Sequence, residues 1–242
     1  MKYNKSSKKY LLIFDFDQTI VDEDSEYEQV KMALSEEEYN KMIEMDYYDG
    51  FNYYFKRLKE KGLTLKDLHS ILEKLELSPK MKELFSYLSK NKSKYDIIIL
   101  SSYIDYSIKH ILKAHGFLDL FDDFLCNRAE MKNNKSQQLL YVPRDQFPHK
   151  CDICNPSQCK SCELEKYLNK KNKKYEKILF VCDGSNDFCP TKKILKKGDI
   201  VFPRAEHSLI KLLSKKNVKN EITCEIFPWK NADEIITKLK EL

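Results

Sequence analysis

The segment LLIFDFDQT, residues 11–19, passes from four apolar residues directly to an aspartate pair. The run Leu11–Phe14 has the length and composition of a strand that is buried on both faces. Residues two positions apart leave a strand on the same side, so Asp15 and Asp17 can face one cavity. This stretch therefore predicts a buried parallel strand with two acids at its carboxyl end.

Apolar runs of strand length alternate with helical periodicity along the rest of the chain. They are found at residues 95–100, 124–126 (a shorter strand), 178–181 and 200–202. This alternation indicates an α/β fold with a Rossmann-like doubly wound parallel sheet. In such sheets ligands bind beyond the carboxyl ends of the strands, so the functional residues are expected there.

The segments that follow two of these strands have their own predictions. Ser101 and Ser102 are expected to open a helix that ends at Gly116. Residues 141–163 are expected to be irregular, and a helix is expected at residues 164–168.

Residues 25–78 form a block without strand patterns, in which apolar residues recur three and four positions apart. Thr64 is the predicted N-cap of a helix within it. The block ends before Pro79, because proline disfavours the helical conformation at the preceding residue. We therefore expect an α/β core of residues 1–24 and 79–242 with an inserted helical unit.

Composition excludes several classes of function. Only five glycines occur among 242 residues, and the sequence contains no Gly-rich phosphate-binding loop motif. No apolar run is long enough for a membrane helix or a signal-peptide core, which predicts a cytoplasmic protein with reduced thiols. The net charge of +5 comes almost entirely from lysine, and this argues against nucleic-acid recognition, in which arginine supplies bidentate contacts.

Polar residues follow three of the predicted strands. Asp15 and Asp17 follow the first, Ser101 the second, and Asp183 and Asp187 the fourth. Crowded carboxylates repel one another and favour a hard cation such as Mg²⁺. With one nearby lysine, this edge is predicted to carry out magnesium-assisted phosphoryl transfer. The simpler alternative is that these aspartates only form turns.

These motifs resemble those of the haloacid dehalogenase (HAD) superfamily of phosphotransferases. The strings Phe14–Glu23, Asp183–Pro190 and Phe227-Pro-Trp229 resemble more closely the phosphoethanolamine/phosphocholine phosphatase family, which includes a pyridoxal phosphate phosphatase branch. The cysteine segment around Lys160 matches as well. The resemblance covers nearly the whole chain after Tyr10.

The resemblance implies a phosphatase mechanism. Asp15 would attack phosphorus and form an aspartyl-phosphate, and Asp17 would protonate the leaving alcohol and then activate water. Thr19 and Ser101 would hydrogen-bond the phosphate or the nucleophile, and Lys160 would stabilise the transferring charge. Mg²⁺ would be held by Asp15, the Asp17 carbonyl and Asp183, with Asp187 orienting its waters. Residues 25–78 become a cap that closes over the phosphate.

Substrate choice is expected to depend on Glu26, Ser102, Tyr103 and Asn186. The resemblance implies two aspartates in members that act on cationic phospho-amino alcohols. One stands where this chain has Ser102, and the other aligns with Glu26. One carboxylate is therefore missing here and one is longer, while Tyr103 offers a ring. We expect poorer activity on phosphoethanolamine and phosphocholine than on pyridoxal phosphate.

Cysteines cluster within residues 141–165. Cys151, Cys154, Cys159 and Cys162 have spacings that can hold a structural zinc ion. His149 is the alternative fourth ligand, since the resembled family has only the first three cysteines. The other interpretation is a set of reduced thiols in a loop. Cys126, Cys189 and Cys224 are predicted to be core residues.

A second class of function stays open beside the small-molecule phosphatase. The chain could keep the HAD fold without catalysis, or act as a zinc-held basic module that binds RNA or protein. The intact pair of Asp15 and Asp17 favours the enzyme. The sequence does not indicate an oligomeric state.

Overall fold

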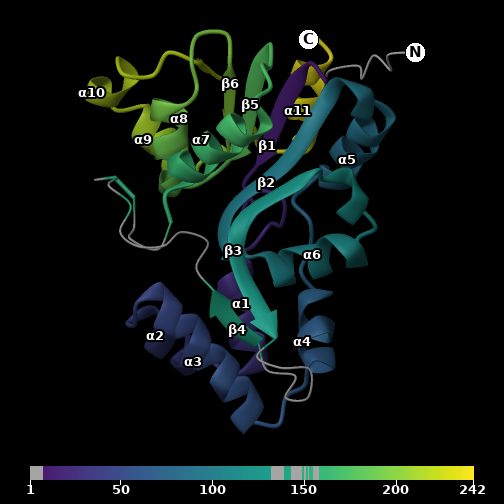
Figure 1. The fold of residues 1–242 in the computed structure, drawn as a ribbon, viewed down its shortest axis with the longest axis vertical. Helices are drawn as coiled ribbons and strands as arrows, with labels where there is room; N and C mark the ends of the chain where they lie inside the picture. The colour runs from purple at the N-terminus through teal and green to yellow at the C-terminus, as the bar shows by residue number, and fades with distance from the viewer. Residues whose placement is uncertain (1–7, 132–138, 143–148, 150, 152, 155–157) are drawn as a thin grey trace.

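The computed structural model describes residues 8–131, 139–142, 149, 151, 153–154 and 158–242 (Figure 1). The strands are β1 (Tyr10–Phe14), β2 (Tyr95–Ile104), β3 (Asp123–Met131), β4 (Leu139–Val142), β5 (Lys177–Cys182), β6 (Ile200–Pro203) and β7 (Glu225–Ile226). The helices are α1 (Ser25–Ala33), α2 (Glu36–Ile43), α3 (Tyr47–Glu60), α4 (Leu65–Leu72), α5 (Met81–Lys90), α6 (Asp105–Ala114), α7 (Lys160–Lys171), α8 (Phe188–Lys193), α9 (Ser208–Leu213), α10 (Lys216–Lys219) and α11 (Ala232–Leu239). Within these residues, no helix has the length and apolar character needed to cross a bilayer.

The strands form one seven-stranded sheet in the order β4-β3-β2-β1-β5-β6-β7. Neighbouring strands are parallel except β3 and β4. The central strand β1 pairs in register with both neighbours, and Tyr10 lies opposite Tyr95 on one side and Lys177 on the other. The chain winds outward from β1 in both directions, which confirms the doubly wound fold. In such folds ligands are expected at the carboxyl end of the strand where the order reverses.

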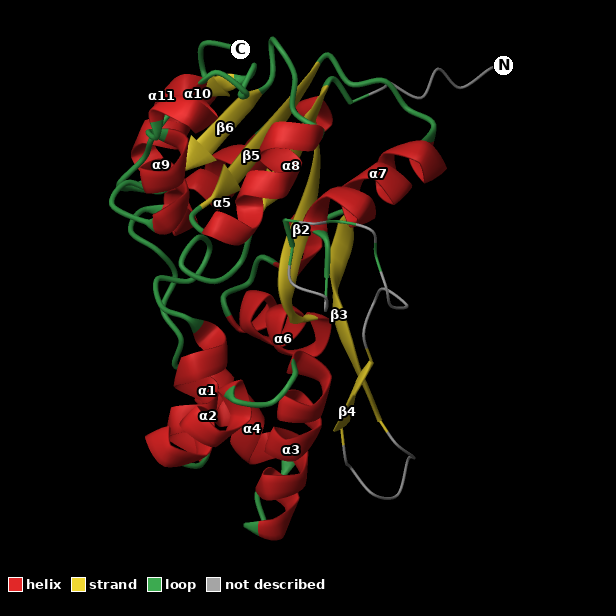
Figure 2. Cartoon of the chain, turned by 90° about the vertical axis from the view of Figure 1, so that its left-hand side faces the viewer, coloured by secondary structure: helices red, strands yellow, loops and turns green. Residues whose placement is uncertain are grey.

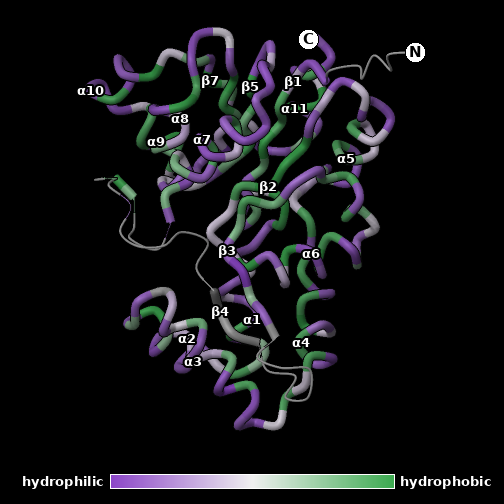
Figure 3. Tube along the Cα trace, in the orientation of Figure 1, coloured by the Kyte–Doolittle hydropathy of each residue, from purple (hydrophilic) through white to green (hydrophobic). Residues whose placement is uncertain are grey.

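Both faces of the sheet are buried, as the continuous apolar run of β1 predicts. Leu12 and Phe14 join the core cluster under α5, α6 and α11, whereas Leu11 and Ile13 join the cluster under α7 and α9. Figure 3 shows the hydrophobic segments following the central strands. The apolar packing therefore fixes β1 rigidly, and with it the residues that come directly after β1.

Helices α1 to α4 lie together beyond the carboxyl edge of the sheet (Figure 1). Each has an N-cap side chain that accepts a backbone amide, and Thr64 forms a complete capping box at the start of α4, as its sequence predicts. The chain enters and leaves this helical group side by side, since Val21 and Leu77 form a bridge. The Ser78 amide also donates to the Ile20 carbonyl at 2.9 Å.

The predicted helix start at Ser101 is wrong. Strand β2 continues through Ser101 and Ser102 to Ile104, and α6 begins at Asp105. The pairing of β2 with β3 shifts register between Leu100 and Ile104, so the strand bends instead of ending. A serine pair is a common helix start, but burial of the following Tyr103 and Ile104 extends the strand.

The predicted third strand is too short. Strand β3 runs to Met131 and pairs with the antiparallel β4, part of which falls in the segment expected to be irregular. This β3–β4 ribbon extends beyond the sheet and lies against α3 (Figure 2). Helix α7 begins at Lys160, four residues before the predicted start at residue 164. The lysine therefore lies on a helix rather than in a loop.

Candidate active site

The turn after β1 presents Asp15 at the carboxyl edge of the sheet. Asp15 is buried, its amide donates to the Val181 carbonyl at 2.9 Å, and its Oδ1 accepts the Phe16 amide at 2.8 Å. The chain then reverses through Gln18, which has a left-handed φ of 52°. These contacts hold the Asp15 carboxylate in one orientation at the end of a rigid strand.

Three buried carboxylates meet at this edge. Asp15 follows β1, Asp183 follows β5, and Asp187 lies in the short turn after it, with one carboxylate oxygen of each within 4.8 Å of the others. Lys160 at the start of α7 reaches this group, and its Nζ lies 2.9 Å from Asp15 Oδ1 and 2.6 Å from Asp187 Oδ1. One lysine against three carboxylates leaves an excess of negative charge that a further cation can balance.

Burial dominates the electrostatics of this group. It raises the pKa of Asp15 well above its usual value, with a further contribution from the Asp187 carboxylate, and it also raises the pKa of Asp187. Burial alone would lower the pKa of Lys160, but the Asp15 and Asp187 carboxylates outweigh it and raise that pKa. Lys160 therefore stays charged, whereas the carboxylates need positive partners to ionise fully.

Asp17 has a different environment from Asp15. Its Oδ1 accepts the Ser25 amide at 2.9 Å and also contacts the Ser25 hydroxyl, at the start of α1. Desolvation, followed by the nearby Asp24 carboxylate, raises the pKa of Asp17 to about 7. A carboxyl group with this pKa can donate a proton at neutral pH and accept one afterwards.

The two predicted hydroxyl groups are buried at the same edge of the sheet. Thr19 is buried and its Oγ1 donates to Asp183 Oδ1 at 3.4 Å. Ser101 is buried on the neighbouring strand, and its Oγ accepts the Tyr103 amide at 3.1 Å. The structure thus brings Asp15, Thr19, Ser101, Lys160, Asp183 and Asp187 to one edge, with Asp17 on the side of the helical group.

Three further residues of this edge are not identified in the sequence analysis. His207 follows β6 and its Nδ1 lies 3.1 Å from Asp183 Oδ2. The Gln158 side chain donates to the Ser101 carbonyl at 3.2 Å, and Ser25 binds Asp17. His207 is detectable in principle because it follows a predicted strand. Gln158 and Ser25 carry no such signal.

The predicted specificity residues differ in their exposure to solvent. Tyr103 is fully buried, and its ring stacks on Phe16 with centroids 6.2 Å apart and contacts Phe51 of α3 at 6.4 Å. Glu26 and Ser102 are partly exposed, whereas Asn186 is exposed. Tyr103 therefore joins the core to the helical group rather than standing free.

The inner wall of the helical group carries unsatisfied polar atoms. Among the described residues, Gln29 Nε2 and Tyr54 Oη are buried without a hydrogen-bond partner. Gln29 Oε1 lies 3.5 Å from Ser107 Oγ of α6, so it sits where α1 meets the core. Buried polar atoms of this kind are costly unless a ligand or water satisfies them.

The Arg204 guanidinium stabilises the turn after β1. Arg204, directly after β6, donates to the Gln18 carbonyl at 2.7 Å and pairs with Asp22. Its guanidinium lies 5.4 Å from the centre of the Trp229 ring, and Trp229 is fully buried with its Nε1 bonded to the Phe202 carbonyl at 2.9 Å. This gives the Phe227-Pro-Trp229 string a structural role in holding the turn that carries Asp17.

The structure groups three of the predicted cysteines with a different fourth thiol from the one predicted. The sulfur atoms of Cys151, Cys154, Cys159 and Cys189 lie within 4.8 Å of one another, and neither Cys162 nor His149 belongs to this group. Cys189, predicted to be a core residue, is buried on α8 directly after Asp187 and Phe188. Sequence spacing could not reveal it, because the pairing depends on α8 packing against α7.

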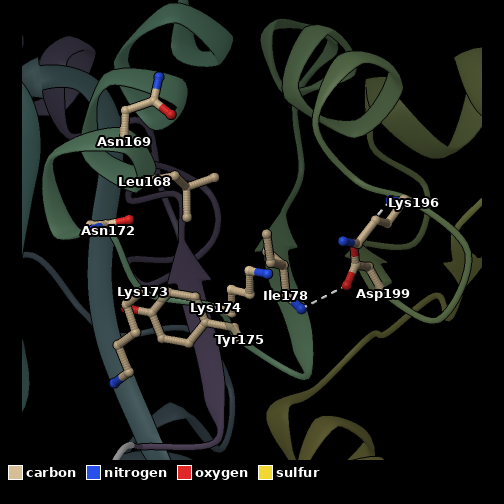
Figure 4. A pocket seen from close by; sticks show the side chains of 9 residues that line it. All are labelled: Leu168, Asn169, Asn172, Lys173, Lys174, Tyr175, Ile178, Lys196 and Asp199. Carbon is tan, nitrogen blue, oxygen red and sulfur yellow. Dashed lines mark hydrogen bonds between the residues drawn. The ribbon is translucent and has the colours of Figure 1, made fainter.

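A hollow at the opposite edge of the sheet does not share this chemistry. It has a volume of about 500 Å³ and lies beside the start of β5, near Ile178 (Figure 4). Its acid Asp199 is already engaged by the amides of Ile178 and Lys196 at 2.8 and 2.9 Å. Its Lys173 is paired with Asp96 at 2.6 Å. The candidate active site is therefore the carboxylate group.

Comparison with known proteins identifies the family of the chain. A family profile described as Putative Phosphatase matches residues 10–242. The chain is 31% identical to a phosphoethanolamine/phosphocholine phosphatase from Gallus gallus over 97% of its own length and 89% of that protein. It is 30% identical to a pyridoxal phosphate phosphatase from Homo sapiens over 97% of its own length and 98% of that protein.

Solved structures share the fold. A phosphoserine phosphatase in its apo form superposes with a TM-score of 0.59 at 21% identity, covering 95% of this chain and 98% of that one. A phosphoserine phosphatase captured as a phospho-aspartyl intermediate analogue gives a TM-score of 0.57 at 20% identity, covering 96% and 99%. These likenesses show that the chain shares the overall fold of these phosphatases.

Proposed function

This chain belongs to the Putative Phosphatase family, and from that premise we propose that it is a magnesium-dependent phosphomonoesterase with Asp15 as its nucleophile. The observation that carries this proposal is the placement of Asp15. Its carboxylate is buried, held at the end of β1, and within 2.9 Å of the Lys160 ammonium. A carboxylate oriented in this way beside a fixed positive charge suits attack on an anionic phosphoryl group.

The first half-reaction transfers the phosphoryl group to the protein. An Asp15 carboxylate oxygen forms a bond to phosphorus, and the bond between phosphorus and the ester oxygen breaks. Asp17, protonated because its pKa is about 7, gives its proton to the departing alkoxide. The alcohol leaves, and the aspartyl-phosphate remains on Asp15.

The second half-reaction hydrolyses the aspartyl-phosphate and regenerates the Asp15 carboxylate. Asp17, now ionised, takes a proton from a water molecule as the water oxygen attacks phosphorus. The bond between phosphorus and Asp15 breaks, and orthophosphate is released with Asp15 restored. Lys160 faces the charge that develops on the transferring group, and Thr19 and Ser101 offer hydroxyls to the phosphate oxygens.

The carboxylate group fits a hard divalent cation. Asp15, Asp183 and Asp187 supply oxygen ligands within 4.8 Å of one another and face a single lysine. These residues would hold Mg²⁺, together with the Asp17 carbonyl. When bound, Mg²⁺ screens the anionic nucleophile from the anionic phosphate. Thr19 and His207 would orient the Asp183 carboxylate through its two oxygens.

Residues 25–78 would act as the cap that selects the leaving group. They begin at Ser25, which binds Asp17, and they contribute the buried Gln29 and Tyr54 with unsatisfied polar atoms. We propose a small phosphorylated metabolite as substrate, of the pyridoxal phosphate, phosphoethanolamine or phosphocholine class of the relatives. Ser102 supplies no charge for an ammonium group, which favours an aromatic or neutral leaving group.

No disulfide links any of the eight cysteines in the structure. We propose a cytoplasmic location, because thiols of this number persist in a reducing compartment.

The experiment is a phosphate-release screen of the purified chain. A panel of phosphorylated metabolites is tested with Mg²⁺ and with a chelator, beside the Asp15→Asn variant as a blank. We expect magnesium-dependent release from at least one small monoester and none from the variant. Equal release by the variant, or no release from any monoester, would contradict the proposal.

A further inference from the structure

Four thiols from two separate parts of the chain meet beside the carboxylate group. Cys151, Cys154 and Cys159 precede α7, and Cys189 lies on α8. Their sulfur atoms lie within 4.8 Å of one another. From this convergence we propose that the four cysteines form a closed, structural Zn²⁺ site, which fastens the start of α7 to α8.

The sulfur separations suit one metal ion. Cys189 Sγ lies 3.6 Å from Cys151 Sγ and 3.9 Å from Cys159 Sγ. Four ligands at the usual zinc–sulfur distance of about 2.3 Å, arranged as a tetrahedron, lie about 3.8 Å apart. Disulfide-bonded sulfurs would lie only about 2.05 Å apart, and all four cysteines are free thiols. A set of four thiolates is the donor set that favours zinc among the divalent metals.

The surroundings suit four thiolates around a dication. Such a site carries a net charge of about −2, which needs nearby donors or positive charge. The Ser161 hydroxyl lies 2.8 Å from Cys189 Sγ, and Lys193 Nζ donates to Cys151 Sγ at 3.4 Å. Cys159 and Cys189 are fully buried. With four protein ligands no position is open to substrate, so the zinc would be structural.

The four cysteines lie close in sequence to two residues of the candidate active site. Cys159 directly precedes Lys160, and Cys189 follows Asp187 by two positions. Lys160 Nζ and Asp187 Oδ1 are themselves 2.6 Å apart. A metal that fixes Cys159 against Cys189 therefore fixes the backbone that carries both partners of this ion pair. The zinc would position Lys160 without contacting substrate.

Metal content tests the proposal without reference to catalysis. The full chain is purified without a histidine tag, and its metal is counted by elemental analysis and native mass spectrometry. We expect about one zinc per chain in the wild type, as a single tetrathiolate site requires. Cys189→Ser should lose most of this zinc, because a serine hydroxyl is a poor ligand. Cys162→Ser, which changes a neighbouring cysteine outside the group, should keep it.

A second measurement covers the case in which Cys189→Ser does not fold. In the native wild type, alkylation should spare Cys151, Cys154, Cys159 and Cys189, and a chelator should make these same four thiols reactive. Replacement of the metal by Co²⁺ should give the absorption of a tetrahedral cobalt–thiolate complex.

Several outcomes would overturn the proposal. The first is a wild type that contains no metal and whose four thiols react freely. The second is an iron–sulfur cluster in place of zinc, or a disulfide between any two of the four cysteines. The third is a loss of zinc from Cys162→Ser equal to that from Cys189→Ser. Metal content does not depend on turnover. A failed phosphatase screen therefore leaves this test intact, and an absent zinc leaves the phosphatase proposal intact.

Discussion

The Ser25 amide donates a hydrogen bond to the Asp17 carboxylate at 2.9 Å, and the Ser25 hydroxyl contacts the same oxygen. Ser25 is the first residue of α1, so the proposed cap begins on the proposed proton donor. Hydrogen bonds to a carboxylate favour its ionised form, and they oppose the burial that raises the pKa of Asp17. The acid strength of Asp17 therefore depends on how the cap is seated.

The pH profile of the wild type follows from Asp17. The protonated form must be present to release an alcohol, and the pKa is about 7, so protonation is lost as the pH rises through neutrality. We expect kcat/KM for an alkyl phosphomonoester to fall above about pH 7, by up to about tenfold per pH unit. A rate that stays constant from pH 7 to pH 9 would argue against Asp17 as the acid.

Ser25→Ala should move this alkaline limb to higher pH. The variant removes the hydroxyl donor and keeps the backbone donor, so the ionised form of Asp17 loses one stabilising contact and its pKa rises further. The measurement is the kcat/KM profile from pH 6 to pH 9. Ser35→Ala, which removes the N-cap serine of α2, is the matched control and should leave the limb in place. A shift to lower pH in Ser25→Ala would contradict the assigned hydrogen bond.

Asp15→Asn should abolish phosphate release while the fold persists. The change is isosteric, but it removes the attacking oxygen and one metal ligand. Less than roughly a hundredth of the wild-type rate should remain. Circular dichroism checks the fold, and Asp119→Asn, at an exposed acid, serves as the control. Greater residual activity would rule out covalent catalysis through Asp15.

Lys160→Met should destabilise the protein and make its stability depend more strongly on Mg²⁺. The variant leaves the buried carboxylates of Asp15 and Asp187 without their ammonium partner, and breaking a buried ion pair costs about 3–5 kcal/mol. Added Mg²⁺ should therefore raise the Tm of the variant more than that of the wild type. Lys170→Met, at an exposed position of α7, should behave like the wild type. Equal Mg²⁺ effects in all three proteins would show that the cation does not bind at these carboxylates.

Ser102→Asp should shift substrate preference toward a cationic alcohol. A charge-assisted contact contributes about 1.5–3 kcal/mol, so the ratio of kcat/KM for phosphoethanolamine over pyridoxal phosphate should rise about ten- to a hundredfold. Ser86→Asp places the same charge on the exposed side of α5 and should leave the ratio unchanged. A wild type that already strongly prefers phosphoethanolamine would refute the inference from Ser102, and the phosphatase assignment would stand.

The parts of the fold that depend on local pattern could be predicted from the sequence. The run Leu11–Phe14 is apolar at every position because both faces of β1 are covered, and this pattern indicates a central parallel strand. Parallel strands bring their carboxyl ends to one edge, so the meeting of Asp15 with Asp183 follows from topology. These residues also carry part of the resemblance to the HAD superfamily.

The parts that depend on tertiary contacts could not. Cys189 joins the thiol group only because α8 packs beside α7, and no spacing rule connects it to Cys159. Ser101 and Ser102 have the pattern of a helix start, but the buried side chain of Tyr103 keeps the backbone in the strand. Ser25 was hidden for a similar reason, since its contact with Asp17 depends on the fold of the turn between them.

The β3–β4 ribbon has a mechanical consequence for the helical group. If the helical group were attached only by its two adjacent linkers, near Val21 and Leu77, it could rotate about them as a rigid body. Here β4 lies against α3 and acts as a third support that is anchored in the sheet through β3. Any movement of α3 away from the core would have to bend this ribbon, so β4 restrains the helical group. A helical group restrained at three points keeps a more constant position over the carboxyl edge of the sheet than one restrained at two.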